Sequence, residues 1–438
     1  MFLYCLLHSL LMLHRVTMEN TIGASEPEIT LKMAIPANAV TAYCEEGNTN
    51  ATFSEAEGNE KNPKIVKKTK AVIIDLGTRY CKMGHAGESK PFSVISSVVG
   101  KRQITDKNGD NQKSFVGQEL LTANMALKYV NPLKHGIVVD WSSVQDFWEY
   151  IFYKEMKILP EEHAVLVSDS PLNPTINREI YAEMMFEIFH TPAIHIANQS
   201  ILSMYSYGKI SGLVVEVGHG VTYVEPIHEG YVLYSNTGWV DYAGLDITKY
   251  LMKLLNHSGN KFTKEDRHIV EHIKNNCCYA SLELGKDLGL PLSEYIVEYE
   301  LPDGNLITIG KERFLCSEVL FKPSLIGSSQ PGLQTLTTIC INNCDTTLKQ
   351  EMINNILLCG GSTLLDGFPE RFQTELKAAL PYDKTTIIAS PHRKYSVWIG
   401  GSILASLKSF QQLWVFKDEY GEWGSSAIHR KCFLGRDP

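Results

Sequence analysis

Acidic, hydroxyl-bearing and basic residues gather around a glycine-containing turn between Ala71 and Gly87, AVIIDLGTRYCKMGHAG. Asp75 ends an apolar run, Gly77 and Thr78 follow it, and Lys82 lies on the far side of the turn. A carboxylate can hold a metal ion through water, and a lysine ammonium can bind a phosphate as a point charge. Small residues at such a turn let an anion approach the backbone N–H groups. The pattern predicts a metal and phosphate site, although an isolated D-x-G-T is more often an ordinary polar hairpin.

A second stretch repeats this design. Gly212 to Gly230 reads GLVVEVGHGVTYVEPIHEG, in which Glu216 ends an apolar run and Gly218 and Gly220 follow. A third stretch, ILLCGGST, runs from Ile356 to Thr363 and predicts a buried strand, a Gly-Gly turn and a helix start where backbone can approach a ligand. The three stretches in this order are much more specific than any one of them.

Strands must position these residues. The apolar, β-branched runs before Asp75 and Glu216 predict buried strands, and each turn leads into a returning strand. Two hairpins of one design predict two domains that face each other across a cleft. Helical patterns surround Trp141–Met156 and Ile176–Phe189, and the polar stretch Gly100–Ser114 predicts an exposed loop.

Composition limits the function classes. The chain has 438 residues, a formal net charge of −8 and ten cysteines without a C-x-x-C pair. This length suffices for two or three domains. The acidic balance argues against a general nucleic-acid-binding protein. Scattered cysteines in a chain of this size are typical of reduced thiols in an intracellular protein.

The N-terminal part differs from the rest. Phe2–Leu13 is apolar but short for a membrane span, and it lacks the preceding basic residue and the clear cleavage site of a secretory signal. Met18 offers an alternative start. Glu19–Asn62 is polar and predicts disorder. A lysine cluster then reads as a solvated linker or as a contact for an acidic partner or membrane surface: Lys61, Lys64, Lys67, Lys68 and Lys70.

Longer blocks extend the pattern of the three turns. They are PEEHAVLVSDSPLNPTINRE (Pro160–Glu179), YELPDGNLITIGKERFLCSE (Tyr299–Glu318), RKYSVWIGGSILASL (Arg393–Leu407) and the ending Arg430–Phe433. Together with the turns, they resemble the actin family, within the wider group of actin, Hsp70 and sugar-kinase ATPases, over about Lys70 to Phe433. Three segments most resemble the testis-specific actin-like proteins of the actin-like 7 group. They are VVDWSSVQDFWEYIF, SMYSYGKISGLVVEVGHGV and FPERFQTEL.

The resemblance implies the α/β actin/Hsp70/sugar-kinase (actin-like ATPase) fold, with two α/β domains around a nucleotide cleft. It implies a disordered N-terminal extension over residues 1–69 and a large domain over 209–395. A small domain over 70–208 would be completed by residues 396–438.

The resemblance also implies a bound Mg-ATP or Mg-ADP. Asp75 would hold the magnesium ion through water, with Glu216 as a less suitable second ligand. Leu245 and Asn275 stand where actin has Arg and Glu, so nucleotide contacts there would differ, and Arg79 stands where actin has Gly. The nucleotide-binding positions are Asp75, Gly77, Thr78, Lys82, Gly218, Gly220, Gly244, Lys274, Gly360, Gly361 and Lys394.

Catalytic positions are only partly retained. Gln199 falls on the glutamine that orients the attacking water in actin. Glu216, His219 and Tyr223 stand where actin has Asp, Asp and His, so a fixed anion and a proton relay are replaced. The resemblance therefore predicts nucleotide binding with very slow or no ATP hydrolysis, from a degenerate ATPase site.

The function that the resemblance implies is a structural actin-related protein of the spermatid cytoskeleton, in the cytoplasm and near the nucleus and acrosome. Cytoskeletal, actin-associated and other actin-related proteins are the expected partners, without nucleic acid and without a transmembrane segment. Two alternatives are a polymerising, ATP-hydrolysing actin-like protein and a nuclear actin-related subunit of a chromatin complex. The motif H-x-x-E-H at His268–His272 matches an inverted zinc-protease pattern, but no third ligand is apparent.

Overall fold

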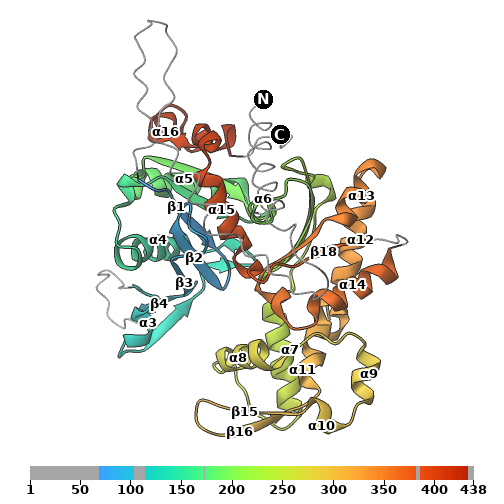
Figure 1. Cartoon of the computed structure of the whole chain (residues 1–438). Helices are drawn as coiled ribbons and strands as arrows, with labels where there is room; N and C mark the ends of the chain where they lie inside the picture. Colours follow the sequence, from blue (N-terminus) through green and yellow to red (C-terminus); the bar gives the residue numbers. More distant parts are fainter. Residues whose placement is uncertain (1–68, 103–113, 172, 381–384, 433–438) are drawn as a thin grey trace, which may run out of the picture. The chain divides into compact units, whose positions relative to one another are not determined.

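The computed structural model describes residues 69–102, 114–171, 173–380 and 385–432 (Figure 1). The described residues form two compact units. The first unit takes in the chain up to Ile210 and again from Tyr395, and the second unit runs from Ser211 to Lys394. Each unit has its own mixed β-sheet and its own hydrophobic core.

The sheet of the first unit is built around the predicted first hairpin. β1 (Val72–Leu76) pairs antiparallel with β2 (Tyr80–His85) and parallel with β9 (Val165–Asp169), and β9 pairs parallel with β10 (Ala193–Asn198). The full order is β19-β10-β9-β1-β2-β3. β1 is buried along its whole length, as its β-branched residues predict.

Further elements complete the first unit. The strands are β3 (Ser93–Ser96), β4 (Val99–Arg102), β5 (Ser114–Val116), β6 (Leu127–Val130), β7 (Leu133–Lys134), β8 (Ile137–Val138) and β19 (Val415–Phe416). The α-helices are α3 (Glu119–Thr122), α4 (Trp141–Glu149), α5 (Thr175–Glu183), α6 (Gln199–Ser206), α15 (Ser396–Ser406) and α16 (Lys417–Trp423). Short 3₁₀ helices span Pro160–Glu162, Lys408–Leu413 and Gly424–Arg430, and Arg393–Tyr395 crosses from the second unit.

Helix α15 returns from the C-terminal part of the chain to pack on β1 and α6 (Figure 1). A Cβ atom on Gly400 would lie 1.7 Å from the carbonyl oxygen of Leu202 in α6, so only glycine permits this approach. The Trp398 indole N–H donates to the carbonyl oxygen of Ile73 at 3.2 Å. Segments far apart in the sequence are therefore held together inside one core.

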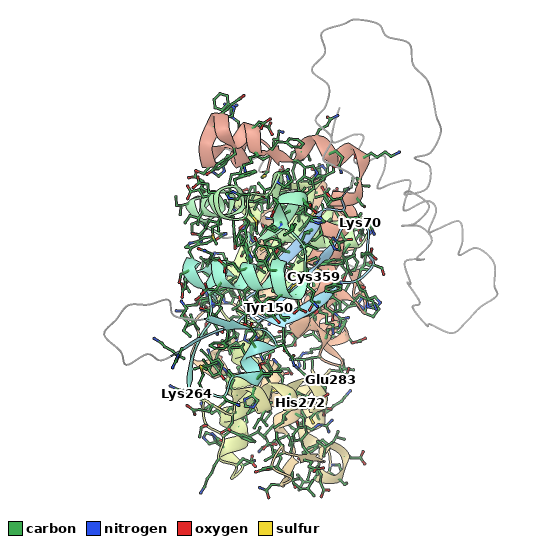
Figure 2. The ribbon with its side chains drawn as sticks, turned by 90° about the vertical axis from the view of Figure 1, so that its left-hand side faces the viewer. Lys70, Tyr150, Lys264, His272, Glu283 and Cys359 are labelled. Carbon is green, nitrogen blue, oxygen red and sulfur yellow. The ribbon has the colours of Figure 1, made fainter. Side chains whose placement is uncertain are left out.

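The two predicted helices of the first unit change their winding. α4 continues as a π-helix over Tyr150–Glu155, and α5 continues as a π-helix over Met184–Ile188. The hydroxyl of Tyr150 (Figure 2) accepts from the Gln118 N–H at 3.2 Å and donates to Glu155 at 3.0 Å. The predicted ranges are confirmed, but an apolar period near 3.6 residues does not distinguish these windings.

The second unit repeats the arrangement of hairpin and parallel neighbour. β11 (Gly212–Val217) pairs antiparallel with β12 (Thr222–His228) and parallel with β17 (Ile356–Cys359). The sheet order is β13-β12-β11-β17-β18, and β14 also pairs with β12. Cys359, at the end of β17, is labelled in Figure 2. The prediction of two hairpins of one design is confirmed.

Other elements surround this second sheet. The strands are β13 (Tyr231–Val232), β14 (Gly238–Val240), β15 (Val297–Glu300), β16 (Leu306–Ile309) and β18 (Ile387–Ile388). The α-helices are α7 (Gly244–His257), α8 (Arg267–Cys277), α9 (Leu284–Gly289), α10 (Leu292–Tyr295), α11 (Glu312–Leu315), α12 (Leu333–Asn343), α13 (Thr346–Asn354) and α14 (Phe368–Ala379). Short 3₁₀ helices span Tyr234–Asn236, Cys316–Leu320, Pro323–Ile326 and Gly361–Leu364.

The predicted loop Gly100–Ser114 is wrong at both ends. Gly100 to Arg102 lie in β4, which pairs with β5 and β6, and Ser114 begins β5. Strand pairing overrides the polar composition there because Gly100 packs against apolar side chains of Leu120 and Leu127. Residues 103–113 lie outside the described residues, as do Phe2–Leu13, Met18 and all but the last residue of the predicted extension 1–69.

A buried ion pair anchors α14 in the second unit. Arg371 Nη1 and Nη2 lie 2.7 and 3.0 Å from the two carboxylate oxygens of Glu318, and Nη1 also donates to the Ser281 carbonyl oxygen at 2.6 Å. Both side chains are less than a tenth exposed. Removing one partner leaves a charge buried without its counter-ion.

We therefore expect Arg371→Met to lower the free energy of unfolding by about 3–5 kcal/mol. The double variant Arg371→Met with Glu318→Leu should recover most of this loss, because no fully buried charge is left unpaired and Glu375, the other partner of Arg371, is 29% exposed. Urea unfolding of the three proteins measures both effects. A loss below about 1 kcal/mol in the single variant would contradict the assigned role.

His195 is buried in the first unit between β19 and the aromatic rings of Phe410 and Trp414. Its Nδ1 lies 3.1 Å from the Leu413 carbonyl oxygen, to which it donates in the neutral form. Burial, together with the positive charge of Lys431, lowers the pKa of His195 to about 4. An unfolded histidine, with a pKa near 6.5, binds its proton first as the pH falls.

Stability from His195 is therefore fully present above about pH 6.5 and is lost as the pH falls toward 4. The expected loss is about 3 kcal/mol, from a shift of roughly two and a half units. His195→Gln, which keeps an N–H donor but does not titrate, should flatten the fall in melting temperature over this pH range. His392→Gln, at an exposed histidine of the second unit, is the control and should leave the profile unchanged.

Candidate functional site

Four predicted or neighbouring side chains form one hydrogen-bonded network in the first unit. Asp75 Oδ2 lies 2.8 Å from the Lys82 ammonium, and Asp75 Oδ1 accepts from the Ser168 hydroxyl at 2.7 Å. The Ser168 oxygen accepts from Gln199 Nε2 at 3.2 Å. The predicted metal-binding, phosphate-binding and water-orienting residues of this unit are therefore brought together.

Sheet topology explains this convergence. Asp75, Ser168 and Gln199 lie at or next to the carboxyl ends of the parallel strands β1, β9 and β10. Asp75 also lies directly opposite Lys82 in the β1–β2 register. Open sheets commonly bind ligands at the carboxyl ends of their strands.

Further contacts fix the first turn. The Thr78 hydroxyl accepts from the Gly136 N–H at 3.0 Å, and the Ser97 hydroxyl donates to the Gly77 carbonyl oxygen at 2.7 Å. A Cβ atom on Gly77 would lie 3.6 Å from the Lys82 ammonium. It would also lie 3.0 Å from the Tyr80 carbonyl oxygen, so glycine fits the close backbone approach of this turn.

Arg79, which could have crowded this turn, has specific contacts of its own. Its Nη1 donates to the Ser96 hydroxyl at 2.6 Å, and its guanidinium lies 4.9 Å from the centroid of the Tyr80 ring. Ser96 lies on β3 directly opposite Tyr80. These contacts hold the guanidinium along the β2–β3 pair.

Three turns meet at the Gly218 carbonyl oxygen in the second unit. It accepts from the Gly244 N–H at 3.1 Å, at the start of α7, and from the Ser362 hydroxyl at 2.6 Å, after β17. The Leu245 N–H donates to the neighbouring His219 carbonyl oxygen at 2.8 Å. The second hairpin turn, the α7 start and the Gly-Gly turn are thereby held in one cluster.

The two glycines of the third turn differ in what surrounds them. Gly360 has φ 85°, and a Cβ atom there would lie 2.3 Å from the Val217 carbonyl oxygen. At Gly361, a Cβ atom would meet nothing within 4 Å. Gly360 is therefore required by the backbone, whereas Gly361 borders open space where a ligand can approach.

Arg393 stabilises this turn from behind. Its Nε donates to the Thr363 hydroxyl at 2.9 Å, and its Nη2 donates to the Thr363 carbonyl oxygen at 2.7 Å. Its own carbonyl oxygen accepts from the Gly360 N–H at 3.2 Å. The neighbouring Lys394 is exposed.

The second hairpin differs from the first in its charges. Glu216 lies opposite Tyr223 in the register, where Asp75 has Lys82, and both Glu216 and Tyr223 are buried. His219 Nδ1 lies 3.8 Å from a carboxylate oxygen of Glu271 on α8. The three residues predicted to differ from those of actin, Glu216, His219 and Tyr223, therefore lie at one hairpin.

Lys274 is also on α8 and is buried. Its ammonium donates to the Gly244 carbonyl oxygen at 3.1 Å and to the Thr248 hydroxyl at 3.0 Å. It thereby fixes the first turn of α7. Gly220, between His219 and β12, completes the predicted positions of this unit.

Sequence reasoning missed Ser168, Ser362 and Arg393. Ser168 had a usable signal, because the polar run Ser168–Ser170 directly follows an apolar strand, as Asp75 does. Ser362 is adjacent to the Gly-Gly pair, but its partner Gly218 is distant in the sequence. Nothing in the sequence indicates that Arg393 binds Thr363.

The histidines of the H-x-x-E-H motif lie on α8 and have protein partners. His268 Nδ1 lies 3.0 Å from the Glu265 carbonyl oxygen, and His272 Nδ1 contacts the Tyr299 hydroxyl. Within the described ranges, no three His, Cys, Asp or Glu residues are grouped so as to hold a metal ion.

Comparison with known proteins gives the family. The model of the actin family matches residues 66–433. The chain belongs to the actin family. Actin-like protein 7B of Homo sapiens is 61% identical over 373 residues, which cover 84% of this chain and 90% of the relative. Actin-like protein 7B of Rattus norvegicus is 60% identical over 374 residues, with the same coverage of each chain. Actin-like protein 7A of Homo sapiens is 58% identical over 382 residues, which cover 87% and 88% of the two chains.

These similarities confirm the predicted affiliation with the actin-like 7 group and the actin-like ATPase fold. The protein is therefore an actin-related cytoskeletal protein. The actin family in general binds a nucleotide and a divalent cation and is typically cytoplasmic. Among the described residues, no helix is both long enough and apolar enough to cross a membrane.

The glycines of the third turn provide a matched pair of substitutions. Gly360→Ala should lower the free energy of unfolding by about 2 kcal/mol, because of its positive φ and the collision with Val217. Gly361→Ala should leave the melting temperature without nucleotide unchanged. It should reduce the rise in melting temperature that millimolar Mg-ATP produces, because its Cβ atom occupies the open space.

Thermal unfolding of nucleotide-stripped protein, with and without Mg-ATP, measures both effects. If Gly361→Ala keeps the full rise in melting temperature with Mg-ATP, this turn does not contribute to the nucleotide site.

Proposed function

We propose that this protein is a structural actin-related component of the spermatid cytoskeleton that holds Mg-ATP or Mg-ADP with little or no hydrolysis. The observation that carries the proposal is the pairing of His219 with Glu271 at 3.8 Å, in the turn where actin has an aspartate. The retained network of the first unit and the open space at Gly361 support nucleotide binding.

The altered turn explains why hydrolysis should be slow. Phosphoryl transfer depends on positioning and on electrostatic stabilisation by a metal ion with an oriented water. Gln199 and Asp75 are kept, so part of this machinery remains. His219 supplies an imidazole, 3.8 Å from Glu271, instead of a carboxylate, and Glu216 is one methylene longer than the aspartate of actin. The effects of substitutions in one catalytic site on the rate are not additive. Compensation for one substitution therefore does not restore hydrolysis.

The cellular role rests on the similarity to actin-like proteins 7A and 7B, from which the sequence resemblance implies a role in testis. Actin-associated and other actin-related proteins are the partners that this role implies. A perinuclear or subacrosomal location is part of the same proposal. Immunolocalisation in testis sections tests it, and a signal absent from spermatids would contradict it.

Single-turnover hydrolysis of bound ATP tests the enzymatic part of the proposal. The wild type should hydrolyse ATP at least about a hundredfold more slowly than a conventional actin in the same assay. The triple variant Glu216→Asp, His219→Asp, Tyr223→His should be faster than the wild type, because it restores the residues of actin. His228→Asn, on the same strand β12 but paired with Glu351, is the matched control and should change nothing.

The outcomes separate binding from catalysis. A wild-type rate equal to that of actin would show that the protein is a working ATPase. Stabilisation by Mg-ATP without turnover supports the proposed scaffold, and robust sedimentation above a critical concentration would favour the polymerising alternative.

A further inference from the structure

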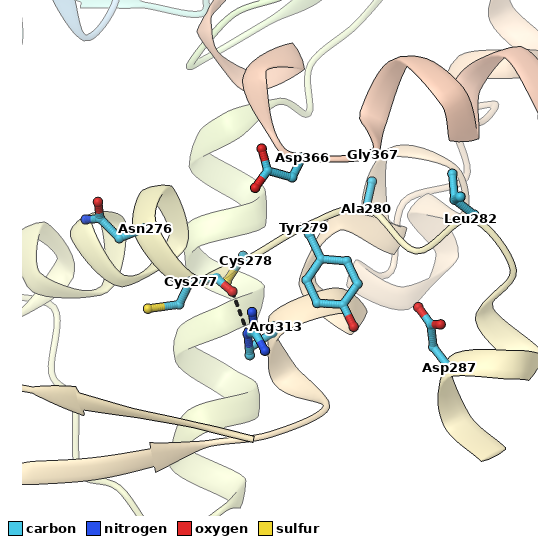
Figure 3. Close-up of a pocket in the computed structure, with 10 residues that line it drawn as sticks. All are labelled: Asn276, Cys277, Cys278, Tyr279, Ala280, Leu282, Asp287, Arg313, Asp366 and Gly367. Carbon is cyan, nitrogen blue, oxygen red and sulfur yellow. Dashed lines mark hydrogen bonds between the residues drawn. The ribbon is translucent and has the colours of Figure 1, made fainter. Parts of the chain in front are cut away.

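A pocket of about 410 Å³ lies in the second unit, beyond the end of α8. Figure 3 shows the Tyr279 ring near its centre, with Asp366 on one side and Asp287 on the other, and Leu282 at one edge. Arg313 also lines it. This volume is within the range of small-ligand sites and accommodates one long side chain.

Arg313 fixes the wall of this pocket. Its Nε donates to the Cys277 carbonyl oxygen at 2.6 Å, and its Nη1 donates to the Tyr295 carbonyl oxygen at 2.8 Å. Its guanidinium lies 5.2 Å from the centroid of the Tyr279 ring. The end of α8, α10 and α11 are thereby tied together, so the pocket is formed without a ligand.

An exposed apolar surface borders the pocket along α9 and α10. Leu282, Leu288, Leu290 and Leu292 are 52%, 50%, 43% and 63% exposed, within eleven residues of chain. We call these four residues the leucine surface. A Cβ atom on Gly285 or Gly289 of α9 would meet nothing within 4 Å, so these positions also face open space. Large exposed apolar side chains this close together in the chain are typical of interaction sites.

The chain segment that carries the leucine surface is predominantly acidic. Between Leu282 and Glu300, the carboxylates are Glu283, Asp287, Glu294, Glu298 and Glu300, against one basic residue, Lys286. Lys286 is paired with Glu283 at 2.7 Å. In the pocket, Asp287 and Asp366 outnumber Arg313, which leaves one net negative charge. Burial and, to a smaller extent, the nearby Asp287 carboxylate raise the pKa of the Tyr279 phenol, against the opposing charge of Arg313.

We propose that the leucine surface and the adjoining pocket dock a basic amphipathic helix of a partner protein. The apolar face of the helix covers the four leucines. One lysine or arginine of the helix enters the pocket, where Asp287 and Asp366 attract it. The two glycines of α9 make this six-residue helix weak alone, so docking also orders it.

A fluorescent model peptide tests the proposal on the full chain. The peptide is helical, with leucines on one face and lysines on the other, and a second peptide carries glutamates in place of the lysines. We expect saturable binding of the lysine peptide and none of the glutamate peptide. The double variants Leu288→Ser/Leu292→Ser and Asp287→Asn/Asp366→Asn should each weaken binding of the lysine peptide at least about tenfold.

Two controls make the result specific. Leu159→Ser replaces a leucine of the first unit that is also 50% exposed, and it should leave the affinity unchanged. The melting temperatures of all variants should match that of the wild type, because Leu288, Leu292 and Asp366 are exposed and Asp287 is only partly buried. A photoreactive lysine peptide should cross-link to residues 276–296 or to Asp366.

Three results would overturn the proposal. They are equal binding of the two peptides, cross-links confined to other segments, and affinity unchanged by both double variants. A wild-type dimer in sedimentation equilibrium that dissociates in Leu288→Ser/Leu292→Ser would also overturn it, because the occupant would then be a second copy of this chain.

Discussion

The buried carboxylate of Asp75 is the constraint on which the first half of the site depends. A carboxylate that is 2% exposed is costly unless it is paired and hydrogen-bonded, and here Lys82 and Ser168 supply both. Lys82 reaches it only in the observed β1–β2 register, because a slip by one residue would turn the lysine to the other face. Ser168 reaches it only because β9 lies parallel beside β1. The charge of Asp75 is thus satisfied only when both the β1–β2 register and the position of β9 beside β1 are correct.

The second unit keeps the shape of this arrangement and changes its charges. β11, β12 and β17 repeat the topology of β1, β2 and β9, and the Gly218 carbonyl oxygen still gathers three turns. The residue opposite the acid is now a tyrosine, and the next polar side chain is a histidine directed at Glu271. Backbone geometry governs how closely a phosphate can approach, whereas fixed charges govern how a metal-bound water is held. Retained geometry with altered charges is the basis of the proposal that nucleotide binding persists while hydrolysis is slow.

Sequence patterns predicted the hairpins, the Gly-Gly turn and the family because each depends on residues that are close together in the chain. Ser168 lies 93 residues from Asp75, and Ser362 lies 144 residues from Gly218, so these contacts exist only after the strands have paired. The same holds for β4, where polar residues were mistaken for a loop because its partner β6 is formed by Leu127–Val130. The π-helices escaped prediction because apolar spacing alone does not fix the winding.

Helix α8 connects the altered turn with the proposed docking surface. Glu271 and Lys274 on α8 contact His219 and the start of α7, and Cys277 at the end of the same helix accepts the Arg313 hydrogen bond. A partner that orders α9 and α10 therefore acts on the residues that hold this end of α8. If docking and nucleotide binding influence one another, the effect on the two affinities must be equal, because coupling between binding sites is reciprocal. A nucleotide that strengthens the proposed docking would by the same rule be bound more tightly by the docked protein, and α8 is the element that contacts both places.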